Sequence, residues 1–84
     1  MVVMAHQVTV MTRAGCHSCE VAEAEVARIC AELAVEWSAT DVDSDPELRA
    51  EYGDRVPVIL IDGREHGFWR VEEPRFRAAL TRAP

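Results

Sequence analysis

The chain has 84 residues, a length that supports one small hydrophobic core and therefore one domain, residues 1–84. Hydrophobic residues form 49% of the sequence and charged residues 29%, a balance that is ordinary for a globular protein and excludes a disordered chain. The formal net charge is −6 and the nine arginines form no basic stripe, so no nucleic-acid partner is expected.

Membrane and secretion signals are not found in the sequence, so we expect a cytoplasmic protein with no membrane partner. No apolar stretch approaches the roughly 20 residues that cross a bilayer. The opening MVVMAHQVTVMTR lacks the basic start and the small-residue cleavage site of a signal peptide. Three cysteines are an odd and small number, which disfavours a secreted fold held together by disulfides. In a reducing cytosol, a close cysteine pair is expected to be catalytic, redox-sensing or metal-binding.

The first predicted elements are a strand and a long helix. Residues 7–12, QVTVMT, alternate and are rich in β-branched side chains, which predicts a strand. Arg13, Ala14 and Gly15 end that strand. From about residue 16 to residue 33 the pattern becomes helical, and Glu20 and Glu23 fall off its apolar face. That face is formed by Ala22, Val26, Ile29, Cys30 and Leu33.

The middle of the chain predicts a second strand and a short helix. Residues 35–43, VEWSATDVD, alternate in the manner of a strand. The segment SDPELRAEYG then carries the start and stop signals of a helix: Asp45 is a good cap and Pro46 suits the first turn. Gly53 suits the left-handed position that often follows the last turn.

The last third of the chain predicts a hairpin and a final helix. Residues 56–61, VPVILI, are nearly all apolar and predict a buried strand. Asp62 and Gly63 form the pair favoured in two-residue hairpin turns, so residues 64–71 should return antiparallel. A helix is expected to begin near Pro74, with an apolar face of Phe76, Ala79 and Leu80. The predicted order is β-α-β-α-β-β-α, an α/β chain with a four-stranded mixed sheet flanked by helices, whose first two strands are parallel.

A pair of cysteines stands where the first strand gives way to the first helix, in the segment GCHSC of residues 15–19. Together with the element order and with Pro57 at the start of the third strand, this Cys-x-x-Cys resembles the thioredoxin fold. The compact chain and the short helix before the third strand resemble the glutaredoxin branch, and most closely the small bacterial glutaredoxin-like proteins. The resemblance runs from about Gln7 to Leu80.

The two cysteines differ in their expected environment. If the helix begins near Cys16, this sulfur lies at the positive end of the helix dipole and beside free backbone N–H groups, which favour the nucleophilic thiolate. Cys19 lies nearly one turn further along and is expected to be more buried. We therefore expect a thiol-disulfide oxidoreductase in which Cys16 attacks a substrate disulfide and Cys19 resolves the mixed disulfide, with no bound cofactor required.

Four further residues are candidate substrate contacts. A protonated His17 would lower the pKa of Cys16, whereas an exposed His17 would have little effect. The resemblance implies that Arg13 contacts a carboxylate of glutathione; the alternative is a charge that faces solvent. It also implies that the bond between Val56 and Pro57 is cis, lies against the thiols and turns the backbone of Val56 toward an extended substrate or glutathione.

The expected partner is a disulfide-containing protein or a glutathione mixed disulfide, and we expect a monomer. The electron donor stays open between glutathione and a thioredoxin-reductase-type protein. Gly67 matches the first of two glycines that glutaredoxins carry after their fourth strand, but Phe68 replaces the second, so glutathione binding also stays open. Phe68 and Trp69 should face opposite sides of a strand, which places one of them in the core. The other stays open between packing under the last helix and an exposed aromatic near the thiols that serves a protein partner. His66 is expected to be an exposed strand residue.

Two other functions stay open. The cysteines of the pair would be ligands in a metal carrier, but zinc favours four ligands, and the other candidates are Cys30, His6, His17 and His66. An iron–sulfur cluster shared between two copies is open for relatives of glutaredoxins. A small adaptor without turnover is a third function. Cys30 lies about 21 Å beyond Cys16 at 1.5 Å per helical residue, so we expect it in the core and unable to pair with Cys16.

Overall fold

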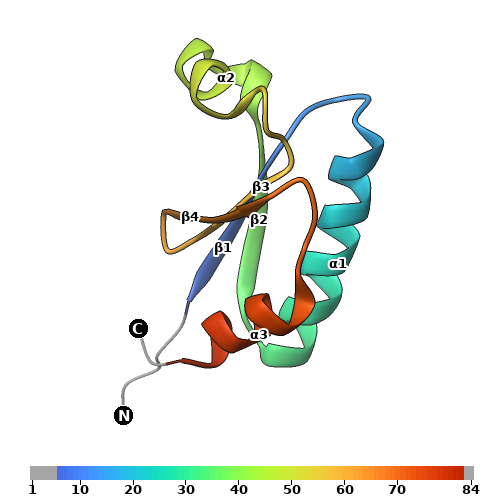
Figure 1. The fold of residues 1–84 in the computed structure, drawn as a ribbon, viewed down its shortest axis with the longest axis vertical. Helices are drawn as coiled ribbons and strands as arrows, with labels where there is room; N and C mark the ends of the chain where they lie inside the picture. The colour runs from blue at the N-terminus through green and yellow to red at the C-terminus, as the bar shows by residue number, and fades with distance from the viewer. Residues whose placement is uncertain (1–5, 83–84) are drawn as a thin grey trace.

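The computed structural model describes residues 6–82 and has the predicted order of strands and helices (Figure 1). The elements are β1 (Gln7–Thr12), α1 (His17–Leu33), β2 (Glu36–Asp41), a short 3₁₀ helix η1 (Val42–Ser44), α2 (Pro46–Tyr52), β3 (Val58–Ile61), β4 (Arg64–Phe68) and α3 (Glu73–Thr81). The four strands form one mixed sheet in the order β2-β1-β3-β4. As predicted, β1 and β2 are parallel and β4 returns antiparallel to β3.

The sheet buries side chains on both of its faces. Val8, Val10 and Ile59 point to the face covered by α1 and α3, where they join the larger core cluster. Met11, Val58 and Leu60 point to the other face. There they form a second cluster with Val42, the residue that follows β2. This follows from the two-residue period of a strand, which sends successive side chains to opposite faces. The central strands β1 and β3 therefore carry both clusters.

Helices α1 and α3 pack on one face of the sheet. Helix α2 lies past the end of the sheet at which β1 and β2 finish (Figure 1). The predicted apolar face of α1 is confirmed at Ala22, Val26, Ile29 and Cys30, all at most 2% exposed. In α3, Phe76 and Leu80 are buried as predicted, whereas Ala79, the third residue of the predicted face, is half-buried. An exposed ion network links the two helices: Arg28 on α1 donates to Glu73 on α3, and Arg77 on α3 donates to Glu32 on α1.

Local signals account for most of the element ends. The Asp45 carboxylate accepts a hydrogen bond from the Glu47 N–H at 2.8 Å and caps α2, as predicted. Asp62 and Gly63 have φ angles of 54° and 82°, the left-handed values that a two-residue hairpin turn of this type requires. The second strand is shorter than predicted and ends at Asp41, because the Asp41 carboxylate accepts from the Asp43 N–H and starts η1.

The prediction of a left-handed Gly53 was wrong. Gly53 follows α2 with a φ of −54° and a ψ of −33°, which is ordinary helical backbone. Its lack of a side chain has another reason: a Cβ atom there would lie 2.5 Å from the Arg49 carbonyl oxygen. The helix thus runs on into a tight turn at Gly53, and close approach rather than a positive φ explains the glycine.

His6 joins the start of β1 to two distant segments. Its Nδ1 is hydrogen-bonded to the Asp62 carboxylate in the hairpin turn, and its Nε2 to the Arg82 carbonyl oxygen after α3. The side chain is almost fully buried. The Arg82 carbonyl and the Asp62 carboxylate both stabilise the imidazolium and raise the pKa of His6 above its usual value.

The part of the chain that the structure describes contains no helix long and apolar enough to cross a membrane. The prediction about a signal peptide rests partly on residues 1–5, which lie outside the described residues.

Candidate functional site

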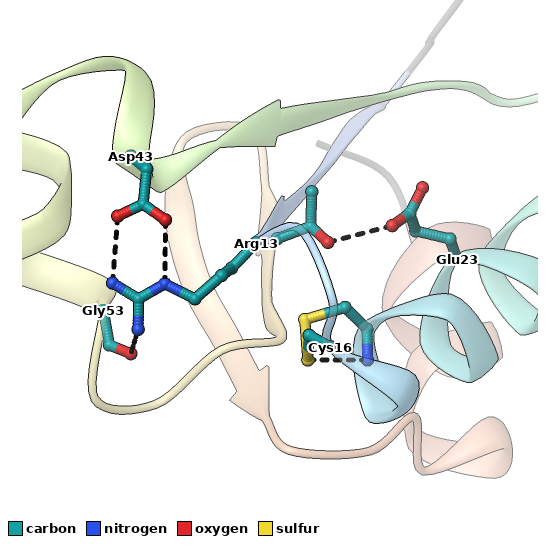
Figure 2. Close-up of a disulfide and its surroundings, with 7 residues drawn as sticks. Arg13, Cys16, Glu23, Asp43 and Gly53 are labelled. Atoms are coloured by element: carbon teal, nitrogen blue, oxygen red, sulfur yellow. Dashed lines mark hydrogen bonds and ion pairs between the residues drawn. A yellow bond between two sulfur atoms is a disulfide. The ribbon is translucent and has the colours of Figure 1, made fainter.

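The two cysteines of the GCHSC segment lie at the start of α1 and form a disulfide (Figure 2). Cys16 is the N-cap residue and is partly exposed, while Cys19 lies in the first turn and is only 1% exposed. Their Cα atoms are 5.2 Å apart. The Cys19 N–H donates to the Cys16 sulfur at 3.1 Å, so a free backbone donor of the helix end points at the outer sulfur.

The turn before α1 places Cys16 at this cap. Gly15 has a φ of 74°, which an L side chain adopts only with strain, and the next residue returns to extended backbone. From there the Cys16 carbonyl accepts from the Glu20 N–H at 3.2 Å and begins the helix. The sulfur of Cys16 therefore lies where the helix dipole favours a negative charge. The negatively charged thiolate is the form that attacks a disulfide.

Arg13 points away from the disulfide and into an acidic contact (Figure 2). Its Nε and one Nη donate to the two oxygens of Asp43, both at 3.0 Å, and its other Nη donates to the Gly53 carbonyl at 3.4 Å. This bidentate pair holds the pKa of the Asp43 carboxyl below its usual value. Neither alternative considered for Arg13 from the sequence included this contact, which joins the end of β1 to η1 and to the end of α2.

A second polar contact lies on the other side of the disulfide. The Thr12 hydroxyl donates to the Glu23 carboxylate at 2.9 Å, which links the end of β1 to the second turn of α1 (Figure 2). The sequence pattern predicts Glu23 off the apolar face of the helix but does not indicate this contact. Because Cys19 and Glu23 are four residues apart on a helix, they share one side of α1, and this contact helps to hold the helix start against β1.

The segment before β3 contains the expected cis peptide bond, between Val56 and Pro57. Pro57 is buried, and its carbonyl accepts from the Trp69 N–H at 2.7 Å. Among residues 6–82, the backbone hydrogen bonds formed outside the helices and strands include none to Val56. Val56 itself is half-buried, and the pairing of its backbone with an extended substrate stays a prediction.

A surface groove of about 320 Å³ adjoins the cysteine pair. His17 and Ser18, the two exposed residues between the cysteines, form its near end. The rest of the lining comes from α1 and from the segment that follows β4: Val21, Ala22, Glu25, Trp69, Arg70 and Val71. Of the predicted substrate contacts, only His17 lines this groove.

The prediction that Phe68 or Trp69 is a core residue was wrong. Phe68 is 42% exposed and Trp69 is 62% exposed, and their rings meet edge to face with centroids 4.9 Å apart. The strand ends at Phe68, and Trp69 has a φ of 72°, so the strand alternation no longer applies to it. His66 also differs from expectation, since it is half-buried against Phe76 and burial lowers its pKa.

The remaining candidate metal ligands are dispersed. Cys30 is 1% exposed in the core, as predicted, and burial raises the pKa of its thiol. His6 is engaged by Asp62 and Arg82. Within residues 6–82, no group of three or more histidine, cysteine or acidic side chains gathers in a way that would hold a metal ion. A zinc site built from one copy of the chain therefore has no support in this part of the molecule.

Comparison with known proteins places these features in a family. Residues 7–81 match the family described as Glutaredoxin-like domain (DUF836). The uncharacterized protein Rv0508 of Mycobacterium tuberculosis is 45% identical over 82 residues, covering 92% of this chain and 84% of that protein.

Solved structures show the same fold. The X-ray structure of protein XcR50 from X. campestris is 36% identical, has a TM-score of 0.73, and is matched over 92% of this chain and 99% of its own. The X-ray structure of Fasciola hepatica thioredoxin, at 24% identity, has a TM-score of 0.63 over 96% of this chain and 83% of its own. The fold is therefore thioredoxin-like, as the sequence predicted.

Proposed function

Since the chain belongs to the family of glutaredoxin-like domains (DUF836), we propose that it is a thiol-disulfide oxidoreductase whose working groups are Cys16 and Cys19. The observation that carries this proposal is the placement of the pair: Cys16 is the partly exposed cap of α1, and Cys19 is buried beneath it. The outer sulfur is the one a substrate reaches, and the Cys19 N–H already donates to it. Cys16 is thus the nucleophile and Cys19 the resolving thiol.

The reaction uses only the two thiols. The Cys16 thiolate attacks one sulfur of a substrate disulfide, and the other substrate sulfur leaves and takes a proton. Cys19 then loses its proton and attacks Cys16, which releases the second substrate thiol and closes the Cys16–Cys19 disulfide. The dithiol is oxidised by two electrons and the substrate is reduced by two, with no bound cofactor.

A reductant must then restore the dithiol. We propose that this donor is glutathione or a thioredoxin-reductase-type protein, and that the chain acts as a monomer in the cytoplasm. The proposal of a cytoplasmic location is supported by the chemistry, because the dithiol turns over only where a reductant restores it.

Intact mass spectrometry tests the assignment of the two cysteines. The reduced wild type and the Cys19→Ser variant are each treated with oxidised glutathione and, separately, with bis(2-hydroxyethyl) disulfide, which is small and uncharged. The wild type should lose two hydrogens with either oxidant. The variant should retain one thiol adduct on Cys16, because its resolving thiol is gone.

The matched variant Cys16→Ser should gain no adduct on Cys19, since that sulfur is buried. A wild type that keeps both thiols with either oxidant would contradict the proposal. The uncharged reagent separates an unreactive dithiol from one that merely binds glutathione poorly.

A further inference from the structure

The groove lies beside the segment that carries the cysteine pair, although neither cysteine lines it. Its near end is formed by His17 and Ser18, which separate Cys16 from Cys19. A substrate joined to Cys16 by a mixed disulfide is held at this point by a covalent bond. The covalent bond therefore holds the residues that flank the substrate cysteine near this end of the groove.

The walls of the groove suit an apolar side chain. Val21 is 49% exposed on α1 and Trp69 is 62% exposed after β4, and both line the groove. Exposed apolar side chains that gather in one concavity, next to a reactive group, are typical of a binding site. Trp69 offers a large flat surface at a small cost in side-chain entropy.

The backbone of Trp69 is held by the segment that contains Val56 and Pro57. The Trp69 N–H donates to the Pro57 carbonyl at 2.7 Å, and Trp69 has a positive φ of 72° that turns the chain out of β4. The backbone that carries the Trp69 side chain is thus tied to the segment before β3 by a hydrogen bond. A contact surface that is ordered before binding loses little entropy when a ligand arrives.

The charges around the cysteines favour a protein segment over glutathione. Glutathione carries two carboxylates and no apolar side chain, so it needs cations rather than apolar walls. Arg13, three residues before Cys16, already donates to both oxygens of Asp43. The groove contains Arg70 but also Glu25, and the chain as a whole has a net charge of −6. An anionic tripeptide therefore finds little unpaired positive charge here.

We propose that this groove selects an apolar side chain next to the cysteine of a disulfide in an extended protein segment, with Trp69 and Val21 as the contacting residues. The inference rests on the proposed function, because it names the substrate class of the Cys16–Cys19 dithiol. Electrons and atoms balance as in that reaction: the dithiol becomes a disulfide and the protein disulfide becomes two thiols.

Single-turnover reduction of two peptide disulfides tests the inference. Both are symmetric dimers of one short uncharged peptide with a single cysteine, followed by leucine in one and by serine in the other. The fully reduced protein is mixed with each, and the released peptide thiol is measured after acid quenching. An apolar contact of this size changes rates by about tenfold, so the leucine peptide should react about tenfold faster than the serine peptide.

Two groove variants should reduce that preference. Trp69→Ala keeps a Cβ at the positive φ and removes the aromatic wall, and Val21→Ser changes an exposed helix position; each should bring the leucine-to-serine ratio toward about 2. Ala24→Ser is the matched control, because Ala24 is exposed on α1 three residues beyond Val21 and does not line the groove. It should keep the wild-type ratio. A wild-type ratio near 1, or a full preference retained in both groove variants, would overturn the inference.

Oxidised glutathione is the third substrate and should react more slowly than the leucine peptide. Asp43→Asn releases Arg13 and should raise the glutathione rate about threefold, the size expected for an exposed ion pair, without changing the leucine-to-serine ratio. A wild type that prefers glutathione to the leucine peptide would overturn the inference but leave the proposed function intact. A protein that reduces none of these three disulfides and does not reduce bis(2-hydroxyethyl) disulfide would overturn both the inference and the proposed function.

Discussion

The two ends of α1 carry cysteines in opposite environments. At its start, Cys16 is partly exposed and faces a backbone N–H donor. The next residue, His17, lines the groove together with the exposed Val21 and Trp69. Eleven residues beyond Cys19 on the same helix, Cys30 is fully buried among apolar side chains. The far end of α1 lies beside α3 (Figure 1). Ion pairs of Arg28 with Glu73 and of Arg77 with Glu32 join the two helices.

This difference shows how one helix serves two purposes. Side chains at the far end are buried or paired with one another, which holds α1 against the sheet and α3. At the near end, Val21 and Trp69 stay exposed to solvent, and the Trp69 ring meets that of Phe68, which is also exposed. We therefore expect reactivity to depend on where a cysteine lies on the helix, because a thiolate is stabilised by the N–H donors at the helix start and needs access to its substrate.

The largest expected effect is that disulfide reduction needs the cysteine at the start of α1, Cys16, and does not need the cysteine near its far end, Cys30. Cys16→Ser should reduce disulfide reduction to the rate of buffer, because serine is no nucleophile toward disulfides without an activating base. Cys30→Ser should leave the reaction with bis(2-hydroxyethyl) disulfide within about twofold of wild type, since Cys30 lies far from the pair. Stopped-flow or quenched assays with the reduced proteins measure both. A Cys30→Ser variant that loses reaction while still folded would break the comparison.

The same variant should affect stability instead. A serine at position 30 would bury a hydroxyl among apolar side chains that offer it no hydrogen bond. This lowers the free energy of unfolding by about 1–3 kcal/mol. Urea denaturation of reduced wild type and Cys30→Ser gives this difference. The burial of Cys30 can be checked in the Cys16→Ser/Cys19→Ser variant, in which Cys30 is the remaining cysteine. Its thiol should react with iodoacetamide only after the protein unfolds. Fast alkylation of the folded variant would show that Cys30 is accessible.

The ion network at the far end of α1 should make stability depend on acid. Hydrogen bonds from Arg28 and Arg77 lower the pKa of Glu73 from 4.5 to about 2. A carboxyl with a depressed pKa stabilises the fold fully above its unfolded value and loses that effect as the pH falls toward the folded value. The Tm of wild type should therefore fall between pH 4.5 and about 2 more steeply than that of Glu73→Gln. Parallel profiles would show that Glu73 contributes nothing there.

The smallest expected effect concerns His6, at the end of the sheet away from the disulfide. The Arg82 carbonyl and the Asp62 carboxylate raise its pKa above 6.5. The stabilisation is fully present below pH 6.5 and is lost as the pH rises through the folded pKa. His6→Gln should flatten the pH dependence of Tm above pH 6.5 while disulfide reduction keeps its own profile. Equal slopes in the two proteins would contradict this role for His6.

The sequence predicted elements whose signals are local. Asp45, the Asp62–Gly63 turn and the alternation of residues 7–12 each depend on neighbours within a few residues, and each was confirmed. The cysteine pair belongs to the same class, because its spacing and its place before a helical pattern are visible in one short segment.

The contacts around the pair could not be predicted in that way. Arg13 and Asp43 are 30 residues apart and meet only because β1 and β2 end at the same edge of the sheet. Thr12 and Glu23 meet through the packing of α1 on β1. Trp69 was misplaced because a strand pattern does not reveal that the chain leaves the strand with a positive φ. Each of these depends on tertiary packing, which a periodicity does not contain.

The position of Trp69 has a consequence for how this molecule can be observed. The chain has two tryptophans, and only Trp69 lines the groove beside His17 and Ser18. Its indole is exposed to solvent, so a side chain that enters the groove replaces water around it. The emission of Trp69, isolated in a Trp37→Phe background, should shift to shorter wavelength when a peptide is bound. The protein thus carries a built-in optical reporter of groove occupancy.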